Sequence, residues 1–446
     1  MTRPAAAPAT VFLVVGTFAS TIANTLVTVP LDRIVTDLGA PLGAGSLVVV
    51  AFNLTCAAML PLAGWLGDRV GRRRLFLVSM VGVAVGAAGA ALAPGLPALV
   101  AFRAVQGLSG ALVLPTVLAL LTTTAGPEHR ARAVSWWAAA NGAGQAAGPS
   151  VGGVLADATG WRSVFVVIIP FALVAFGGAA RLLERDAPRP VRLDVAGALT
   201  LTLGTLGLLG GAATAAAAGP ASPAVWVPVA AGVLALVAFV VVERRVEQPF
   251  VPLSLLREAR FARSAVAALA QMLCLTATLL VVPLYLLTAR GMSTAEAGLL
   301  VVAVPAVMTV LAPVVGRLTE AWRPRLALRH GLGVLVAAET CLAVAVGRGS
   351  GPVALAVVCG VVGVGMALTQ TPAAAGAARS AREADSGAGL GVFNALRFVG
   401  AALGGVVVAL AVGDAPADRL STVVVALVCA GCALVALGVS FAGRVR

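Results

Sequence analysis

The chain has 446 residues, of which 60% are hydrophobic and 11% are charged. Soluble domains contain about 25% charged residues, so this composition excludes a water-facing globular protein and indicates a chain surrounded by lipid. The net charge of +13 comes from arginines in short clusters between apolar runs, without the basic face and stacking aromatics expected of a nucleic-acid-binding protein.

Long apolar runs recur along the whole chain. A bilayer core about 30 Å thick requires about 20 apolar residues of helix, and glycine and proline inside such runs are compatible with membrane helices. We therefore predict an all-α membrane protein with fourteen transmembrane helices. The predicted spans are 9–31, 45–66, 75–94, 97–124, 134–156, 163–183, 195–217, 224–242, 263–288, 296–316, 328–347, 353–376, 388–412 and 420–442.

Arginine is distributed unevenly between alternate loops. If the N-terminus is cytoplasmic, most arginines fall in inner segments, and the outer segments carry only Arg33, Arg162, Arg290, Arg348 and Arg419. Cytoplasmic loops of membrane proteins carry the excess of positive charge. The distribution therefore predicts that both termini are cytoplasmic.

The two halves of the chain repeat each other. Pro30 in LVTVPL recurs as Pro283 in LLVVPL, and Asn141 recurs as Asn394, both 253 residues later. These pairs fall on helices separated by eight spans, an even shift that indicates parallel repeats. We predict two six-helix bundles joined by a two-helix insertion and a cytoplasmic linker, over 1–190, 191–260 and 261–446.

The run GWLGDRVGRRR ends the second predicted helix. Its glycines allow close approach of backbones, and Asp68 can accept hydrogen bonds from Arg72. The run resembles the loop signature GxLxDRxGRR of the major facilitator superfamily, which implies a latch at an inner gate. The matching residues are Gly64, Gly67, Asp68, Arg69, Gly71 and Arg72.

The fifth predicted helix contains NGAGQAAGPSVGG. Glycines spaced by four residues form a smooth face for a partner helix, and Pro149 frees a carbonyl and bends the helix. Generic packing of small residues is the alternative interpretation. The run resembles the antiporter signature GxxxGPxxGG of the same superfamily, which implies a gating hinge. The matching residues are Gly144, Gly148, Pro149, Gly152 and Gly153.

Two arginines lie inside predicted spans. An arginine at the centre of a membrane helix costs about 2.5–3.5 kcal/mol on insertion scales and needs a partner or a water path. RAVQG, with Arg103 and Gln106, resembles the fourth-helix motif RxxQG of the superfamily. Arg397, which follows Asn394 in NALRFVG, should face the bundle interior and is counted with the gating residues.

GWRSVF and LDVAG, which precede the sixth and seventh predicted helices, also resemble the fourteen-helix drug:proton antiporter family. That family has an acid in its first helix, where this chain has Ala23. We expect proton exchange through Asp32, paired with Arg103, or through Glu339. Asp32 is preferred because the resemblance places the first and fourth helices of each half at the cavity and the third, which carries Glu339, outside it.

The resemblance implies a secondary transporter of the plasma membrane that exports a small lipophilic molecule in exchange for protons by alternating access. We expect a monomer whose partners are substrate, protons and lipid bilayer, without nucleic acid, cofactor or metal. An uptake symporter and a membrane-embedded enzyme are the rival functions, the second disfavoured because no nucleophile–base pair or metal cluster is evident. The expected cavity residues are Asn24, Thr25, Thr28, Gln106, Gln271, Thr369 and Gln370.

Overall fold

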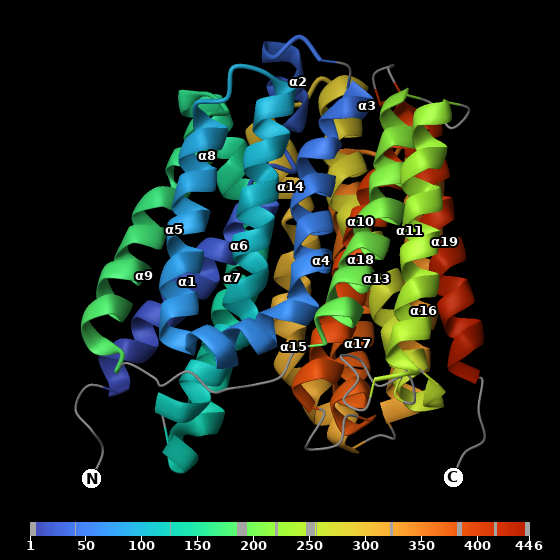
Figure 1. The fold of residues 1–446 in the computed structure, drawn as a ribbon. Helices are drawn as coiled ribbons and strands as arrows, with labels where there is room; N and C mark the ends of the chain where they lie inside the picture. The colour runs from blue at the N-terminus through green and yellow to red at the C-terminus, as the bar shows by residue number, and fades with distance from the viewer. Residues whose placement is uncertain are drawn as a thin grey trace.

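The computed structural model describes residues 6–40, 42–124, 126–184, 194–218, 222–246, 255, 257–321, 324–380, 386–413 and 417–441. In these ranges every regular element is a helix, and the long helices run side by side (Figure 1). The helices are α1 (Ala6–Thr25), α2 (Leu31–Asp37), α3 (Leu42–Gly45), α4 (Leu47–Val70), α5 (Arg72–Ala91), α6 (Leu96–Thr124), α7 (Gly126–Thr159), α8 (Ser163–Val166), α9 (Ile168–Leu182), α10 (Val195–Ala218), α11 (Pro223–Glu243), α13 (Ala259–Thr288), α14 (Thr294–Val301), α15 (Ala303–Ala321), α16 (Pro324–Gly347), α17 (Pro352–Ser380), α18 (Ser386–Val412) and α19 (Arg419–Phe441).

Twelve helical stretches in the described residues are long and apolar enough to cross a membrane, whereas the sequence predicts fourteen spans. The predicted span 9–31 falls on α1, whose apolar part Ala9–Thr25 is shorter than a full span. The predicted span 134–156 lies in α7, a 34-residue helix rich in glycine, alanine and polar residues, which lower its hydropathy. The prediction of fourteen spans is therefore not confirmed by this count.

Two short breaks interrupt the helices of the first half. The first helix stops at Thr25, and Pro30, which has no N–H group to continue a helix, immediately precedes α2. Gly71 separates α4 from α5 with φ +95°, a conformation that a residue with a side chain rarely adopts. The glycine thus allows an abrupt turn at the end of the predicted latch.

The two ends of the bundle differ in what they carry. At one end lie α2 and α8, and at the other α1 begins and α19 finishes (Figure 1). These are called the α2 end and the terminal end below. Which end faces the cytoplasm stays a prediction from the arginine distribution.

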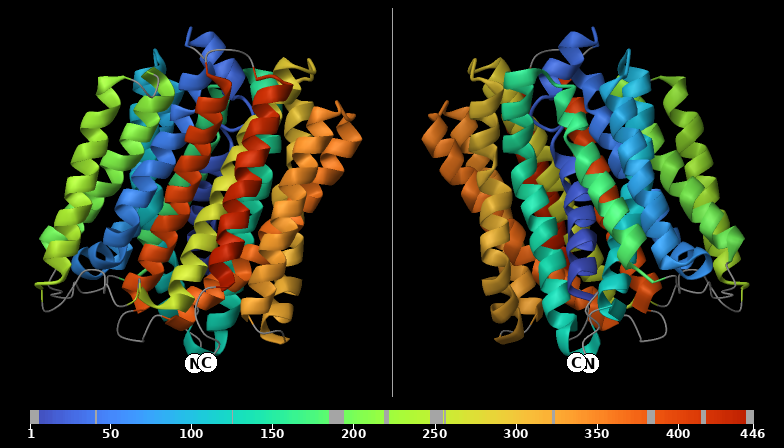
Figure 2. Two further views of the ribbon diagram at one scale, coloured as in Figure 1. Left: turned by 90° about the vertical axis from the view of Figure 1, so that its right-hand side faces the viewer. Right: turned by 90° about the vertical axis from the view of Figure 1, so that its left-hand side faces the viewer.

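The helices of the two halves interlock. Within the first half α1 packs on α7, and α7 also packs on α14 and α15 of the second half. Correspondingly, α13 packs on α18, which also packs on α4 of the first half. The helices α10 and α11 pack mainly on each other and lie at the edge of the molecule (Figure 2), with α10 touching α4 and α18.

Candidate functional site

The polar residues predicted to line a cavity are enclosed by packed helices. Gln106, Gln271 and Thr369 have no exposed surface, and Thr25 and Thr28 are also buried. The threonine hydroxyls are satisfied by helix backbone, Thr369 by the Gly365 carbonyl on its own helix and Thr25 by the Gly144 carbonyl of α7. Asn24 and Gln370 are half-buried.

The glutamines differ from the threonines because part of each amide is unsatisfied. Gln106 Oε1 accepts from Arg103 at 2.8 Å, but Gln106 Nε2 has no partner among the described residues. Gln271 Nε2 reaches only the sulfur of Met366 at 3.5 Å, and the Oε1 atoms of Gln271 and Gln370 have no described partner. A buried polar atom without a partner costs about 1–3 kcal/mol. These amides therefore have unused hydrogen-bonding capacity for a ligand or water.

Arg103 ties three helices together. Its Nε donates to the Val48 carbonyl of α4 at 3.1 Å, and its Nη1 donates to the Ala23 carbonyl of α1 at 2.7 Å and to Gln106. The guanidinium lies 4.6 Å from the ring centroid of Phe52, within range of a cation–π interaction. Backbone carbonyls thus hold this buried charge in place.

The structure does not bring Asp32 to Arg103. Asp32 lies half-buried in the first turn of α2, and the described ion pairs do not include it. Burial raises the pKa of Asp32 above its ordinary value, and the neighbouring Arg33 opposes that rise. The expected Asp32–Arg103 pair is absent because the Arg103 guanidinium is engaged by the carbonyls of α1 and α4.

Glu339 of α16 is completely buried and points toward α13. Thr278 Oγ1 donates to Glu339 Oε1 at 3.2 Å, and Glu339 Oε2 has no described partner. The expectation that this helix packs outside the cavity-lining helices is consistent with its neighbours α17 and α19. The carboxyl group nevertheless reaches the back of α13, the first helix of its half.

Two thiols converge on this carboxyl group. Potential ligand atoms of Cys274, Glu339 and Cys429, on three different helices, all lie within 4.8 Å of one another. Among the described residues this is the one such group of three, and thiols and carboxylates are metal ligands. The Cys274 thiol donates to the Cys429 carbonyl at 3.4 Å, so helix packing already accounts for the contact. The sequence placed these cysteines in apolar runs but could not show that they meet.

Arg397 lies at the middle of α18, among neutral neighbours. Its Nη1 donates to Asn394 Oδ1 at 3.1 Å, and its Nη2 lies 3.7 Å from the sulfur of Met272 in α13. The buried Nε has no partner among the described residues. Arg397 is therefore held much less completely than Arg103.

The glycines of α7 face two different helices. A Cβ atom built on Gly144 would lie 2.9 Å from Thr21 Cβ, and one on Gly148 2.5 Å from Thr25 Cβ, both in α1. A Cβ atom on Gly153 would lie 2.5 Å from the Thr294 carbonyl oxygen at the start of α14. Pro149 lies inside the helix between these contacts, at a position where the missing N–H leaves one helix carbonyl unpaired. Small residues thus bring α7 into backbone contact with both halves of the chain.

A matching glycine face on α18 was missed in the sequence. Cβ atoms on Gly400 and Gly404 would meet the backbone of α13, and one on Gly405 would lie 2.7 Å from Val50 of α4. These residues follow Gly148, Gly152 and Gly153 by 252 positions. Their four-residue spacing was the available signal. The repeat therefore places two glycine-faced helices where the halves meet.

The predicted latch at the terminal end contains the expected pair. Arg72 donates to Asp68 at 3.0 Å, while Gly67 is buried and Arg69 is exposed. A Cβ atom built on Gly64 would have no neighbour within 4 Å.

The next arginine in the latch has a counterpart in the second half. Arg73 donates to the Ala180 carbonyl at the end of α9 at 2.6 Å. Arg325, 252 residues later, donates to the Ser440 and Phe441 carbonyls at the end of α19 at 3.1 and 2.9 Å. Cations are favoured at helix C-termini. Each arginine therefore binds the C-terminal carbonyls of the last helix in its half.

A second set of polar contacts, at the α2 end, was not predicted. Arg33 forms an ion pair with Asp157 at the end of α7, and Asp157 Oδ2 accepts from the backbone N–H of Ala295 in α14 at 2.6 Å. This acid therefore links the two halves. Nearby, Asp37 accepts from Trp161 at 2.9 Å and from Arg162 at 2.7 Å, which gives the GWRSVF segment a structural role.

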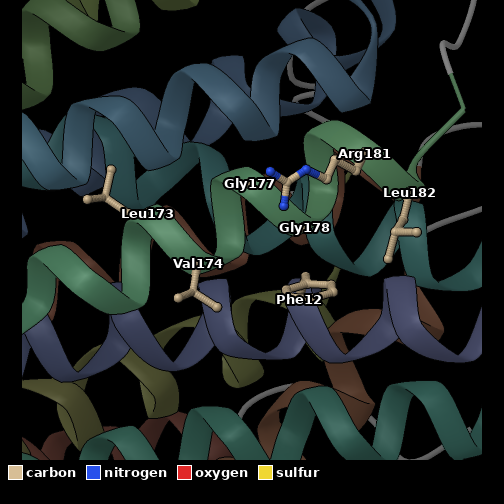
Figure 3. A pocket seen from close by; sticks show the side chains of 7 residues that line it. All are labelled: Phe12, Leu173, Val174, Gly177, Gly178, Arg181 and Leu182. Atoms are coloured by element: carbon tan, nitrogen blue, oxygen red, sulfur yellow. The ribbon is translucent and has the colours of Figure 1, made fainter.

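Two grooves lie on the flanks of the molecule rather than among the predicted cavity residues. The groove between α1 and α9 has a volume of about 510 Å³ (Figure 3) and is lined by Phe12, Leu173, Val174, Gly177, Gly178, Arg181 and Leu182. A groove between α16 and α19 has a volume of about 550 Å³ and is lined by Leu326, Arg329, His330, Gly333, Val334, Ala337, Leu437 and Phe441. Neither groove includes a residue predicted to contact substrate.

Curated relatives of this chain include three proteins whose names refer to export, resistance or transport. The tetracenomycin C resistance and export protein of Streptomyces glaucescens is 32% identical over 71% of this chain and 59% of its own length. The multidrug resistance protein Stp of Mycobacterium tuberculosis is 29% identical over 80% and 66%. The probable actinorhodin transporter of Streptomyces coelicolor is 32% identical over 74% and 58%. The chain thus matches less than two thirds of the length of each relative.

Two solved structures have a similar fold. A bacterial homologue of the human lysosomal transporter Spinster, inward-facing and unoccupied, gives a TM-score of 0.69 at 16% identity over the full length of both chains. The human organic anion transporter MFSD10 gives 0.62 at 17% identity over 98% of this chain and all of the other. At these identities the likeness shows the fold alone.

The model of the Major Facilitator Superfamily matches residues 11–405, nearly the whole chain. The curated relatives named above carry names that refer to drug resistance, export or transport. With twelve candidate spans, these matches indicate a multi-pass protein of the plasma membrane. The chain therefore belongs to the major facilitator superfamily.

Proposed function

We propose that this chain exports a small lipophilic molecule in exchange for protons by alternating access, acting as a monomer. The observation that carries the proposal is the set of partly unsatisfied amides on helices of both halves, those of the buried Gln106 and Gln271 and of the half-buried Gln370. In the conformation described here the two flank grooves do not include these groups. A substrate would supply their missing partners in an open state.

The glycine-faced helices α7 and α18 support alternating access. Each packs on a helix of its own half and on a helix of the other half. Helix faces made of glycine allow neighbouring helices to change their crossing angle, because no large side chains interdigitate between them. In this proposal the Asp157 contacts close the α2 end, and the Asp68–Arg72 latch works at the terminal end.

In the proposed topology α1 and α7 also cross the membrane, which raises the twelve candidate spans to fourteen. The spans form two six-helix bundles over 1–190 and 261–446, and both termini are cytoplasmic. The arginine distribution supports the orientation. Single cysteines introduced at Arg74, Glu184 and Arg348, all exposed, test it in a cysteine-free background. An impermeant reagent added outside intact cells should label only Arg348→Cys, and outside labelling of Glu184→Cys would overturn the span count.

We place the coupling proton on Glu339 ahead of Asp32. Glu339 is fully buried, and its only described hydrogen bond comes from Thr278 on α13, whereas Asp32 has Arg33 beside it and does not meet Arg103. A carboxyl group in apolar surroundings is costly to ionise. Gain and loss of its proton would therefore change how α13 and α16 pack.

Everted membrane vesicles test both the direction of transport and the coupling residue. Addition of a transported drug should dissipate a preformed pH gradient in wild type and Asp32→Asn but not in Glu339→Gln. Exchange of labelled drug should persist in Glu339→Gln, because only the proton step is lost. The reverse result for the two variants would return coupling to Asp32. Drug accumulation that requires a gradient of the opposite sign would favour the uptake symporter.

A further inference from the structure

Arg397 is a half-buried cation whose hydrogen-bonding capacity is mostly unused. A guanidinium carries five N–H donors, and the described partners of Arg397 are one amide oxygen, on Asn394, and one thioether, on Met272. A thioether sulfur is a weak acceptor. The buried Nε has no described partner. The guanidinium therefore has N–H donors available for a stronger acceptor.

The described residues supply no counter-ion for this charge. The ion pairs found there join Arg33 with Asp157, Arg72 with Asp68, and Arg162 with Asp37. Asn394 and Met272, the described partners of Arg397, are both uncharged. A charge inside a membrane-spanning helix is costly, and such charges commonly mark the path of a substrate or ion.

Arg103 provides the contrast within the same chain. Carbonyls of α1 and α4 and the Gln106 amide already bind its guanidinium, so its charge has a structural use. The side chain stacks on Phe52, whose apolar cluster also contacts Ala395 and Phe398 of α18. Nη2 of Arg103 also has no described partner, but this guanidinium donates to three oxygen atoms, whereas that of Arg397 donates to one oxygen and contacts one sulfur.

The neighbouring side chains are polar but neutral. Gln271 adjoins Met272, the residue that Arg397 touches, and reaches Met366 of α17. Gln271 Oε1 and Gln370 Oε1 have no described partner. Amide groups can donate to or accept from hydroxyl and carbonyl groups. The two amide oxygens can accept from hydroxyl or N–H groups of a ligand whose anionic group lies on Arg397, and none of these neighbouring side chains is a carboxylate.

We propose that the transported molecule is an organic anion, with a carboxylate or an ionised phenol that docks on the guanidinium of Arg397. The inference rests on the proposed export function and names its substrate class. A planar guanidinium binds a carboxylate through two parallel hydrogen bonds, which a lysine ammonium does not reproduce. Organic cations would meet two positive charges and be rejected.

Purified protein in proteoliposomes tests this with two xanthene dyes of similar size, carboxyfluorescein as the anion and rhodamine 123 as the cation. With an imposed pH gradient, wild type should move carboxyfluorescein at least tenfold faster than rhodamine 123. Arg397→Gln should lose at least tenfold of the anion transport, and Arg397→Lys should retain a minor part with a raised KM. The exposed Arg348 gives the matched control Arg348→Gln, which should behave as wild type.

The outcomes separate the two proposals. Transport of rhodamine 123 without carboxyfluorescein would overturn the anion inference and leave the export function standing. Transport of neither dye by well-folded protein would overturn the proposed function itself. If Arg397→Gln unfolds in detergent, the KM of Arg397→Lys for carboxyfluorescein tests the proposal instead. A KM equal to that of wild type would contradict docking of the anion on Arg397.

Discussion

Gly153 and Gly298 hold the two halves of the chain in backbone contact at the α2 end. A Cβ atom on Gly153 would lie 2.5 Å from the Thr294 carbonyl oxygen, and one on Gly298 2.7 Å from the Pro149 carbonyl oxygen. Ordinary contacts begin near 3.4 Å, so each substitution by alanine requires α7 and α14 to separate by about 0.7–0.9 Å. Backbone atoms cannot rotate away as a flexible side chain can.

Overpacking of this kind costs about 1–3 kcal/mol. Because the contact joins separate halves, the cost applies to the conformation in which the α2 end is closed. We therefore expect Gly153→Ala to shift the closed-to-open ratio about 5- to 150-fold toward opening at the α2 end. Gly177→Ala is the matched control, since a Cβ atom there has no neighbour within 4 Å and the change adds the same helix propensity.

Spin labels measure this shift directly. Leu92 and Val353, 81% and 79% exposed, belong to different halves and provide label positions in a cysteine-free background. The label distance should lengthen in Gly153→Ala and in Gly298→Ala, and transport should slow. The same distance distribution in Gly153→Ala and Gly177→Ala would refute the reasoning.

Three further predictions follow from other contacts. Asp68→Asn should slow transport several-fold at equal protein level, because Arg72 loses its charged partner, and an unchanged rate would contradict a gating role. Arg103→Ala should abolish transport and lower the Tm, since it removes a buried cation and leaves three buried acceptors without their donor. Arg103→Lys should rescue little, and near-normal activity of that variant would reduce Arg103 to a generic charge. Hydrogen bonds from Trp161 and then Arg162 lower the pKa of Asp37 below its ordinary 3.8, so their stabilisation is present above that pH and is lost as the pH falls through the lowered pKa. In a variant that keeps Trp161 as its sole tryptophan, the tryptophan fluorescence should change only below pH 3.8. A fluorescence transition above pH 3.8, or the same pH profile in Asp37→Asn, would contradict the assignment of this transition to Asp37.

Most helix positions could be predicted from the sequence. The predicted span 224–242 corresponds to α11 at Pro223–Glu243, and 388–412 corresponds to α18 at Ser386–Val412. A helix in lipid satisfies its own backbone hydrogen bonds, so an apolar run of sufficient length determines the element locally. The Asp68–Arg72 pair was also predictable, because residues four apart share one face of a helix.

Side-chain partners between helices were decided by the tertiary structure. Arg103 binds the carbonyls of Ala23 and Val48 instead of Asp32, and Glu339 meets Thr278. Such contacts depend on the rotation of each helix about its axis and on its offset along a neighbour. Apolar runs rich in alanine, valine and glycine specify neither quantity, because many rotations bury similar small side chains. The amino-acid sequence by itself therefore determined the spans and the family signatures, and packing of the assembled helices determined which polar groups meet.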